Sequence, residues 1–201
     1  MSLLTGRDRD SVLARVLAKL EAQGILNEAL LQERMAVADS GTPRNGALMV
    51  ARAWLDEDYK ALLLRDGRAA AEAIGVHVPW APPLGVLENT DHVHYLLVCT
   101  LCSCYPRWLL GYPRDWYKSS TYRARAVREP RALLAEWGQR IADSTVVRVV
   151  DSTADYRWMV LPQRPAGTDG WTLEQLADIV TADALVGADA LHEAALRKPS
   201  A

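Results

Sequence analysis

The chain has 201 residues, of which half are hydrophobic, 24% are charged, 12 are glycine and three are cysteine. This composition excludes collagen, coiled coils, wholesale disorder and disulfide-rich secreted scaffolds, and it is typical of a globular protein with a buried core. Because 23 basic residues nearly balance 25 acidic ones, the net charge of -2 creates no general attraction to nucleic acid or anionic lipid. We therefore expect neither nucleic acid nor a membrane as a partner.

The first third of the sequence predicts helices. An apolar stripe of Leu13, Val16, Leu17 and Leu20 has helical spacing and indicates a helix over residues 11–24. Asn27 can cap a second, short helix, residues 47–54 are apolar and helical in character, and a further helix is expected from residue 56 to residue 74. These apolar faces are expected to be packing surfaces rather than catalytic sites.

Residues 77–83 contain three prolines and mark the best candidate boundary, because proline disfavours both regular helices and central strands. We expect residues 1–83 to form an N-terminal helical arm and linker, and residues 84–201 to form a metal-binding α+β domain with α/β/β/α-like layers. Strands are predicted over residues 84–87, 92–98, 146–150 and 157–161. Helices are predicted over residues 122–127, 131–137 and 173–180, the last with a capping box made by Thr172 and Gln175.

All three cysteines lie in the run Cys99-Thr100-Leu101-Cys102-Ser103-Cys104, called the cysteine cluster below. Cys-x-x-Cys lets two soft sulfurs converge on one ion, and a third cysteine two residues later brings the Ser103 and Cys104 peptide nitrogens close to it. If those nitrogens deprotonate, three sulfurs and two nitrogens form a square pyramid with one open octahedral position. Such donors favour trivalent cobalt or iron over zinc, and the open position suits Lewis-acid catalysis.

Three other interpretations of the cysteine cluster remain open. A structural zinc site would need a fourth ligand, for which His92 and His94 are the candidates, although strand alternation puts both on the face opposite Cys99. The cysteines could instead be buried core residues without metal, or neighbouring thiols that sense oxidation.

The cysteine cluster with Val98 resembles the metal-binding motif of the nitrile hydratase alpha subunit, and Thr100 resembles the cobalt-type version of it. The resemblance covers about residues 25–187. It is carried by residues 43–47, 51–54, 98–104, 110–111, 115–118, 122–131, 148–149, 159–162, 164–170 and 174–176.

The resemblance implies a nitrile-hydrating enzyme with non-corrin cobalt(III), or less favourably iron(III), bound by the sulfurs of Cys99, Cys102 and Cys104 and the backbone nitrogens of Ser103 and Cys104. It also implies that Cys102 is a sulfinate and Cys104 a sulfenate, with Cys102, Ser103 and Cys104 in catalytic roles. The attacking oxygen is either the Cys104 sulfenate oxygen or an activated water.

The same resemblance implies partners. Beta-type subunits, as one chain or split in two, would supply arginines to the oxidised sulfurs, and a cobalt-activator protein would load the metal. The resemblance also implies that the substrate is a small-molecule nitrile. No apolar run approaches the roughly 20 residues that span a bilayer, and residues 1–8 lack a signal-peptide core, so we expect a cytoplasmic protein.

Arg107 and Trp108 are candidates for the substrate pocket. Cobalt-type nitrile hydratases usually have tryptophan where this chain has Arg107, and the sequence Cys-Tyr-Pro-Arg resembles instead the gamma subunit of thiocyanate hydrolase. Arg107 would suit an anionic substrate through charge-assisted hydrogen bonds, or it could simply pair with an acidic group.

A basic run with interleaved aromatic residues follows the cysteine cluster. Helical spacing divides its arginines among several faces and Glu129 and Glu136 lie nearby, so we interpret them as solvated or engaged in salt bridges. They are Arg114, Arg123, Arg125, Arg128 and Arg131.

Overall fold

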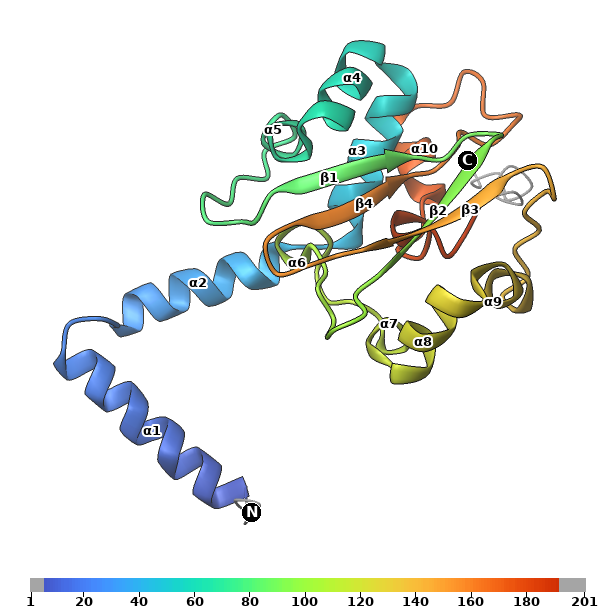
Figure 1. Ribbon diagram of the computed structural model, residues 1–201. Coiled ribbons are helices and arrows are strands. Elements are labelled where there is room, and N and C mark those ends of the chain that lie inside the picture. Colours follow the sequence, from blue (N-terminus) through green and yellow to red (C-terminus); the bar gives the residue numbers. More distant parts are fainter. Residues whose placement is uncertain (1–5, 192–201) are drawn as a thin grey trace. The chain divides into compact units, whose positions relative to one another are not determined.

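The computed structural model describes residues 6–191 (Figure 1). Contacts divide the chain into two compact units, Met1–Asp39 and Ser40–Ala201. The first unit contains helix α1 (Gly6–Ala22) and most of α2 (Glu28–Ser40). The predicted cap of the second helix is present, since the Leu30 N–H donates to Asn27 Oδ1 over 2.7 Å. Leu13 and Val16 of the predicted apolar stripe are exposed, at 57% and 48% of their surface.

The second unit begins with three helices, α3 (Pro43–Leu55), α4 (Glu57–Arg65) and α5 (Gly67–Glu72). The single helix predicted from residue 56 to residue 74 is therefore wrong, because it is broken at Asp66. Asp66 has an extended backbone with φ −149°, and its carboxylate accepts hydrogen bonds from the backbone N–H groups of Arg68 and Ala69. An aspartate in this conformation ends one helix and caps the next.

The helices α3 to α5 pack with the strands rather than apart from them. Tyr59 and Leu63 of α4 are buried, α4 and α5 contact the first strand, and α3 contacts α10. The second compact unit therefore begins at Ser40 and extends well N-terminal to the division predicted after residue 83.

Four strands form two parallel pairs. β1 (Leu84–Glu88) pairs with β4 (Arg157–Leu161), and β2 (Val93–Val98) pairs with β3 (Val146–Asp151). All four predicted strands are confirmed to within one residue. In the β2–β3 register, Val98 lies opposite Asp151, so the carboxyl ends of both strands meet at one edge, directly before Cys99.

Helices lie beside each of the two strand pairs. The remaining elements are α6 (Arg107–Leu110), α7 (Asp115–Lys118), α8 (Ser120–Arg128), α9 (Pro130–Glu136), α10 (Leu173–Ile179) and the 3-10 helix η1 (Ala184–Val186). Figure 1 shows α3, α4 and α10 grouped beside β1 and β4, and α7 to α9 grouped beside β2 and β3. The predicted helices that became α8, α9 and α10 are confirmed, as is the Thr172–Gln175 capping box.

The α+β class with mixed helices and strands is thus confirmed. The sequence did not predict α6 and α7, because four residues are too few for a helical apolar period. Gly187 lets the turn after η1 approach β2: its φ is +79°, and a Cβ there would lie 1.8 Å from the Tyr95 carbonyl oxygen. Among the described residues, every helix is too short or too polar to cross a bilayer.

Candidate metal centre

The cysteine cluster lies at the carboxyl edge of the β2–β3 pair. Cys99 follows β2 immediately and is buried, with 1% of its surface exposed, whereas Cys102 is exposed and Cys104 is half-buried. The Cys99 and Cys102 sulfurs are 3.5 Å apart, and those of Cys102 and Cys104 are 3.4 Å apart. All three Sγ atoms lie within 4.8 Å of one another. The turn therefore brings the three thiols together at one point.

These separations fit sulfurs that share one ion. With metal–sulfur bonds of about 2.3 Å, two sulfurs on one ion are separated by roughly 3.3–3.8 Å, from octahedral to tetrahedral geometry. Within residues 6–191, this is the one group of three metal-binding side chains whose ligand atoms converge. The donor set of soft sulfurs suits a transition metal rather than magnesium or calcium.

The carbonyl oxygens and the N–H groups of the cysteine cluster have different hydrogen-bond partners. The Cys104 carbonyl accepts a hydrogen bond from the Tyr117 hydroxyl at 3.0 Å, and the Leu101 carbonyl accepts one from Arg123 Nη1 at 3.0 Å. These carbonyl oxygens therefore bind side chains of α7 and α8. The Cys102 N–H, in contrast, donates to the Cys99 sulfur at 3.3 Å, and hydrogen bonds of the Ser103 and Cys104 backbone lower the pKa of the Cys102 thiol. Amide nitrogens that face the sulfurs are what a mixed sulfur and nitrogen ligand set requires.

The thiols of Cys102 and Cys104 have pKa values that are shifted in opposite directions. The pKa of Cys102 is lowered, first by the hydrogen bond with the Cys104 thiol and then by the Ser103 backbone N–H and the Cys99 thiol. The pKa of Cys104 is raised to about 12, first by burial and then by its hydrogen bonds with the other two thiols, while the Arg157 guanidinium acts in the opposite direction. Because these two thiols interact directly, their protons come off as a pair rather than independently.

The start of the turn is tied to the neighbouring strand. Both the backbone N–H and the hydroxyl of Thr100 donate to the Asp151 carboxylate at the end of β3. Arg157, at the start of β4, has an Nη1 atom that is buried without a hydrogen-bond partner among the described residues. The cysteine cluster is therefore bordered by one anchoring carboxylate and one guanidinium with an unused donor.

Neither candidate histidine joins the cysteine cluster. His94 is buried, and its Nδ1 atom contacts Asn89 Nδ2 at 3.2 Å while its Nε2 atom contacts the Gly187 carbonyl at 2.7 Å. Both ring nitrogens are therefore occupied. The group of converging metal-binding side chains contains the three cysteines and neither His92 nor His94. The structural zinc interpretation thus lacks its fourth ligand within the described part of the chain.

The two residues predicted for a substrate pocket have different surroundings. Arg107 is exposed at the start of α6, and its guanidinium lies 3.9 Å from the centre of the Tyr112 ring. It has no acidic partner among the described residues, which argues against simple pairing within this chain. Trp108 is buried at 9% exposure, and its indole Nε1 has no hydrogen-bond partner among the same residues. Only Arg107 is thus presented to solvent.

Sequence reasoning missed the residues that hold the turn from outside. Tyr117 and Arg123 come from helices after the cysteine cluster, and Asp151 lies far along the chain. Nothing local distinguished Arg123 from the other arginines of its basic run. The available signal was the strand ending at Asp151, because parallel pairing would bring its carboxylate beside the residue after Cys99.

Comparison with known proteins decides the family. Residues 8–189 match the family model described as nitrile hydratase, alpha chain. The chain belongs to the nitrile hydratase alpha chain family. It is 45% identical over 185 residues to the low-molecular weight cobalt-containing nitrile hydratase subunit alpha of Rhodococcus rhodochrous, which covers 90% of this chain and 89% of that protein.

Two further similarities bear on this nitrile hydratase family member. It is 46% identical over 156 residues to the thiocyanate hydrolase subunit gamma of Thiobacillus thioparus, covering 72% of this chain and 64% of that protein. Among solved structures, a thiocyanate hydrolase mutant superposes with a TM-score of 0.83 at 38% identity, covering 94% of this chain and 91% of that one. A double mutant of the Fe-type nitrile hydratase of Comamonas testosteroni Ni1 gives 0.79 at 38% identity, covering 94% and 92%.

Proposed function

We propose that this chain is the metal-binding, alpha-type subunit of a nitrile hydratase that converts a nitrile to the amide at a non-corrin cobalt(III) centre. The observation that carries the proposal is the convergence of three cysteine sulfurs, all within 4.8 Å of one another. Family membership and the cobalt-containing relatives support the choice of reaction and metal. Iron(III) is the less favoured alternative.

The ligands are the sulfurs of Cys99, Cys102 and Cys104 and the backbone nitrogens of Ser103 and Cys104. A trivalent ion held there supplies Lewis acidity that makes a nitrile carbon more electrophilic. The protein contributes fixed donor positions and leaves one side of the cysteine cluster open, because Cys102 is exposed and Cys104 is only half-buried. The Ser103 hydroxyl is assigned to hydrogen bonding with the oxidised sulfurs or a nearby water.

Oxidation of Cys102 to a sulfinate and of Cys104 to a sulfenate belongs to the same proposal. Susceptibility to oxidation follows solvent access, and Cys99 is the one buried thiol of the three. The exposure pattern therefore supports oxidation at the later two positions. Water beside the Cys104 sulfenate would add its oxygen to the nitrile carbon, and its two protons would end on the nitrile nitrogen to give the amide. If the sulfenate oxygen attacks instead, its bond to sulfur breaks as the amide leaves, and a water molecule that attacks the sulfur restores the sulfenate and supplies the two protons.

The enzyme needs partner chains in this proposal. Negative oxygens on sulfur require cationic donors, and beta-type subunits, as one chain or split in two, supply arginines to them. A cobalt-activator protein loads the metal in the cytoplasm. The names of the relatives, subunit alpha and subunit gamma, support a multi-subunit assembly.

The test is co-expression with the neighbouring genes in cobalt-supplemented medium, followed by metal analysis and the intact mass of the peptide that carries Cys99 to Cys104. About one cobalt per chain, together with the mass of three added oxygens, is expected from one sulfinate and one sulfenate. One zinc per chain without added oxygen would return the site to a structural role. Reversible disulfide formation without metal would indicate a redox sensor.

Thiocyanate is the second candidate substrate. The observation that favours it is Arg107, whose guanidinium is exposed and has no acidic partner within residues 6–191. An exposed guanidinium three residues after Cys104 would stabilise an anionic substrate that reaches it. Turnover of thiocyanate and of a small neutral nitrile by the same cobalt-loaded complex separates the two candidates.

A further inference from the structure

Two neighbouring side chains of α8 reach the backbone on either side of Cys99. The Tyr122 hydroxyl donates to the Leu97 carbonyl in β2, before Cys99, and Arg123 Nη1 donates to the Leu101 carbonyl after it. Tyr122 is buried and therefore fixes α8 against the strand. From the helix that Tyr122 fixes, the Arg123 side chain reaches the turn between the first and second cysteines.

Leu101 has no side-chain packing that could hold it in place. Its side chain is 88% exposed, the highest value among the exposed large hydrophobic residues of the described chain. The turn is instead held by polar contacts to its backbone: Thr100 is bound by Asp151, and the next residue is bound by Arg123. Because Leu101 directly precedes Cys102, a change in its carbonyl direction would rotate the peptide that places the second sulfur.

We propose that Arg123 is a positioning residue of the metal centre. Its hydrogen bond keeps the Leu101 carbonyl turned toward α8, so that the chain bends back and the Cys102 sulfur lies 3.5 Å from that of Cys99. The inference rests on the proposed function, since it concerns a metal held by this turn. Groups that orient metal ligands from outside act on affinity and on the electronic properties of the bound ion.

The Nε atom of Arg123 is buried and makes no competing hydrogen bond within the described residues. Among the described residues, the side-chain hydrogen bond of Arg123 is the one to the Leu101 carbonyl. Arg123 therefore connects α8 to the turn between the first two cysteines.

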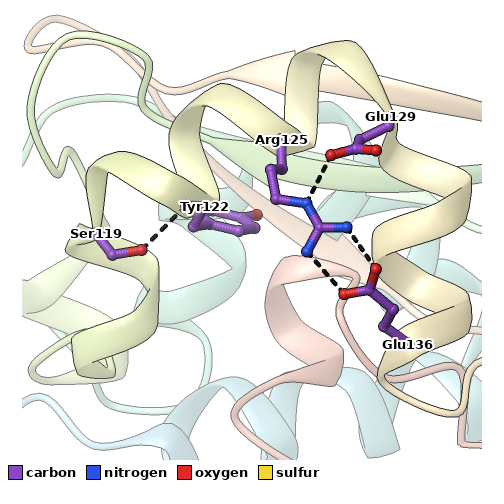
Figure 2. A network of polar contacts seen from close by, with 5 residues as sticks. All are labelled: Ser119, Tyr122, Arg125, Glu129 and Glu136. Atoms are coloured by element: carbon purple, nitrogen blue, oxygen red, sulfur yellow. Dashed lines mark hydrogen bonds and ion pairs between the residues drawn. The ribbon is translucent and has the colours of Figure 1, made fainter.

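Arg125 provides a matched control on the same helix. Its Nε atom donates to Glu129 at 2.6 Å, and its two terminal nitrogens donate to Glu136 at 2.7 and 2.6 Å. Figure 2 shows the guanidinium enclosed between these two carboxylates, with the Ser119 cap at the other end of α8. Arg125 thus joins α8 to α9, and its side-chain hydrogen bonds within the described residues go to these two glutamates rather than to the cysteine cluster.

The experiment compares Arg123→Gln, Arg123→Lys and Arg125→Gln in the cobalt-loaded complex with its partner subunits. Cobalt retention against a chelator, the sulfur-to-metal charge-transfer band and the thermal midpoint are measured for each. We expect Arg123→Gln to lose cobalt about 10- to 100-fold faster than the wild type and to shift the band. Arg123→Lys keeps a charged donor and restores part of the retention. Arg125→Gln lowers the midpoint but keeps the cobalt and the band.

The outcomes separate the inference from the function on which it rests. Wild-type cobalt retention and an unchanged band in Arg123→Gln would overturn the positioning role while leaving the hydratase intact. Equal cobalt loss in Arg125→Gln would also overturn it, since a general effect of α8 would then suffice. If the wild-type complex itself holds zinc or no metal, the proposed function fails first. Should Arg123→Gln give no soluble complex, Arg123→Lys is compared with Arg125→Lys by the same measurements and criteria.

Discussion

Asp151 holds Thr100 by two hydrogen bonds. Its Oδ1 atom accepts from the Thr100 backbone N–H at 3.0 Å, and its Oδ2 atom accepts from the Thr100 hydroxyl at 2.5 Å. The parallel register makes this possible, because Val98 at the end of β2 lies opposite Asp151 at the end of β3. The β2–β3 pair therefore fixes the start of the cysteine turn at Thr100, one residue after Cys99.

Replacement of Asp151 by asparagine should weaken the attachment of Thr100 at the start of the cysteine turn. Thr100 donates to both carboxylate oxygens, and an amide replaces one of them by an NH2 group, which donates and cannot accept a hydrogen bond. We expect cobalt retention and hydration activity to fall by about 10- to 100-fold, the range for partners that orient metal ligands. Thr100→Ser is the control: it keeps both donors and should stay close to wild type. Equal retention in Asp151→Asn and wild type would show that the carboxylate does not hold the turn.

The strands and the metal-binding cysteines could be predicted because their signals are local. Short runs rich in valine and leucine gave β1 to β4, and the spacing of three cysteines indicated one shared ion. The break at Asp66 was missed because the surrounding residues continue a helical pattern. Only the carboxylate's bonds to Arg68 and Ala69 decide that a new helix starts there.

The supports of the metal centre could not be predicted, because they depend on pairing between distant segments. Asp151 reaches Thr100 only when β3 pairs with β2 in the observed parallel register. Arg123 and Arg125 are equivalent in a basic run, yet one binds the Leu101 carbonyl and the other binds two glutamates. Helical spacing separates such residues onto faces but does not say what each face contacts.

Removal of the third thiol tests the ligand set directly. Cys104→Ala deletes a sulfur that lies 3.4 Å from that of Cys102, while it leaves the backbone nitrogens in place. We expect both metal retention and turnover to be abolished, because the remaining two sulfurs and two amide nitrogens form an incomplete donor set that no longer stabilises the trivalent ion. Cobalt content and nitrile hydration are measured on the same preparation. A variant with full hydration activity would end the five-donor model.

Arg107 should distinguish charged from neutral substrates. Its guanidinium is exposed and stacks on Tyr112 without an acidic partner among the described residues. Arg107→Met keeps an unbranched apolar stem but removes the charge, so kcat/KM for thiocyanate should fall by at least about 10-fold relative to that for a neutral nitrile. Tyr112→Leu, which removes only the ring, should leave the ratio between the substrates nearly unchanged. A parallel loss for both substrates in Arg107→Met would assign Arg107 to packing or to a partner chain.

The Arg125 network predicts a stability effect on the acid side of neutrality. Its hydrogen bonds hold the pKa of Glu136 below the ordinary value of 4.5, while Arg125 stays protonated throughout because its own pKa is raised. A carboxyl group with a depressed folded-state pKa contributes stability above its unfolded-state value, and this contribution disappears as the pH falls through the folded-state value. Glu136 should therefore stabilise the fold at pH 7 and lose that effect below about pH 4.5.

Thermal midpoints of wild type and Glu136→Gln between pH 7 and pH 3 measure this contribution. The two should differ most at pH 7 and converge as Glu136 is protonated, since the variant cannot titrate at this position. Asp115→Asn is the control, because Asp115 also has a lowered pKa but lies fully in solvent in a single pair with Lys118. An exposed single pair of that kind contributes little, so the difference in midpoint between wild type and Asp115→Asn should be small beside that for Glu136→Gln. A difference between wild type and Glu136→Gln that stays constant down to pH 3 would assign the effect of Glu136 to packing rather than to its charge.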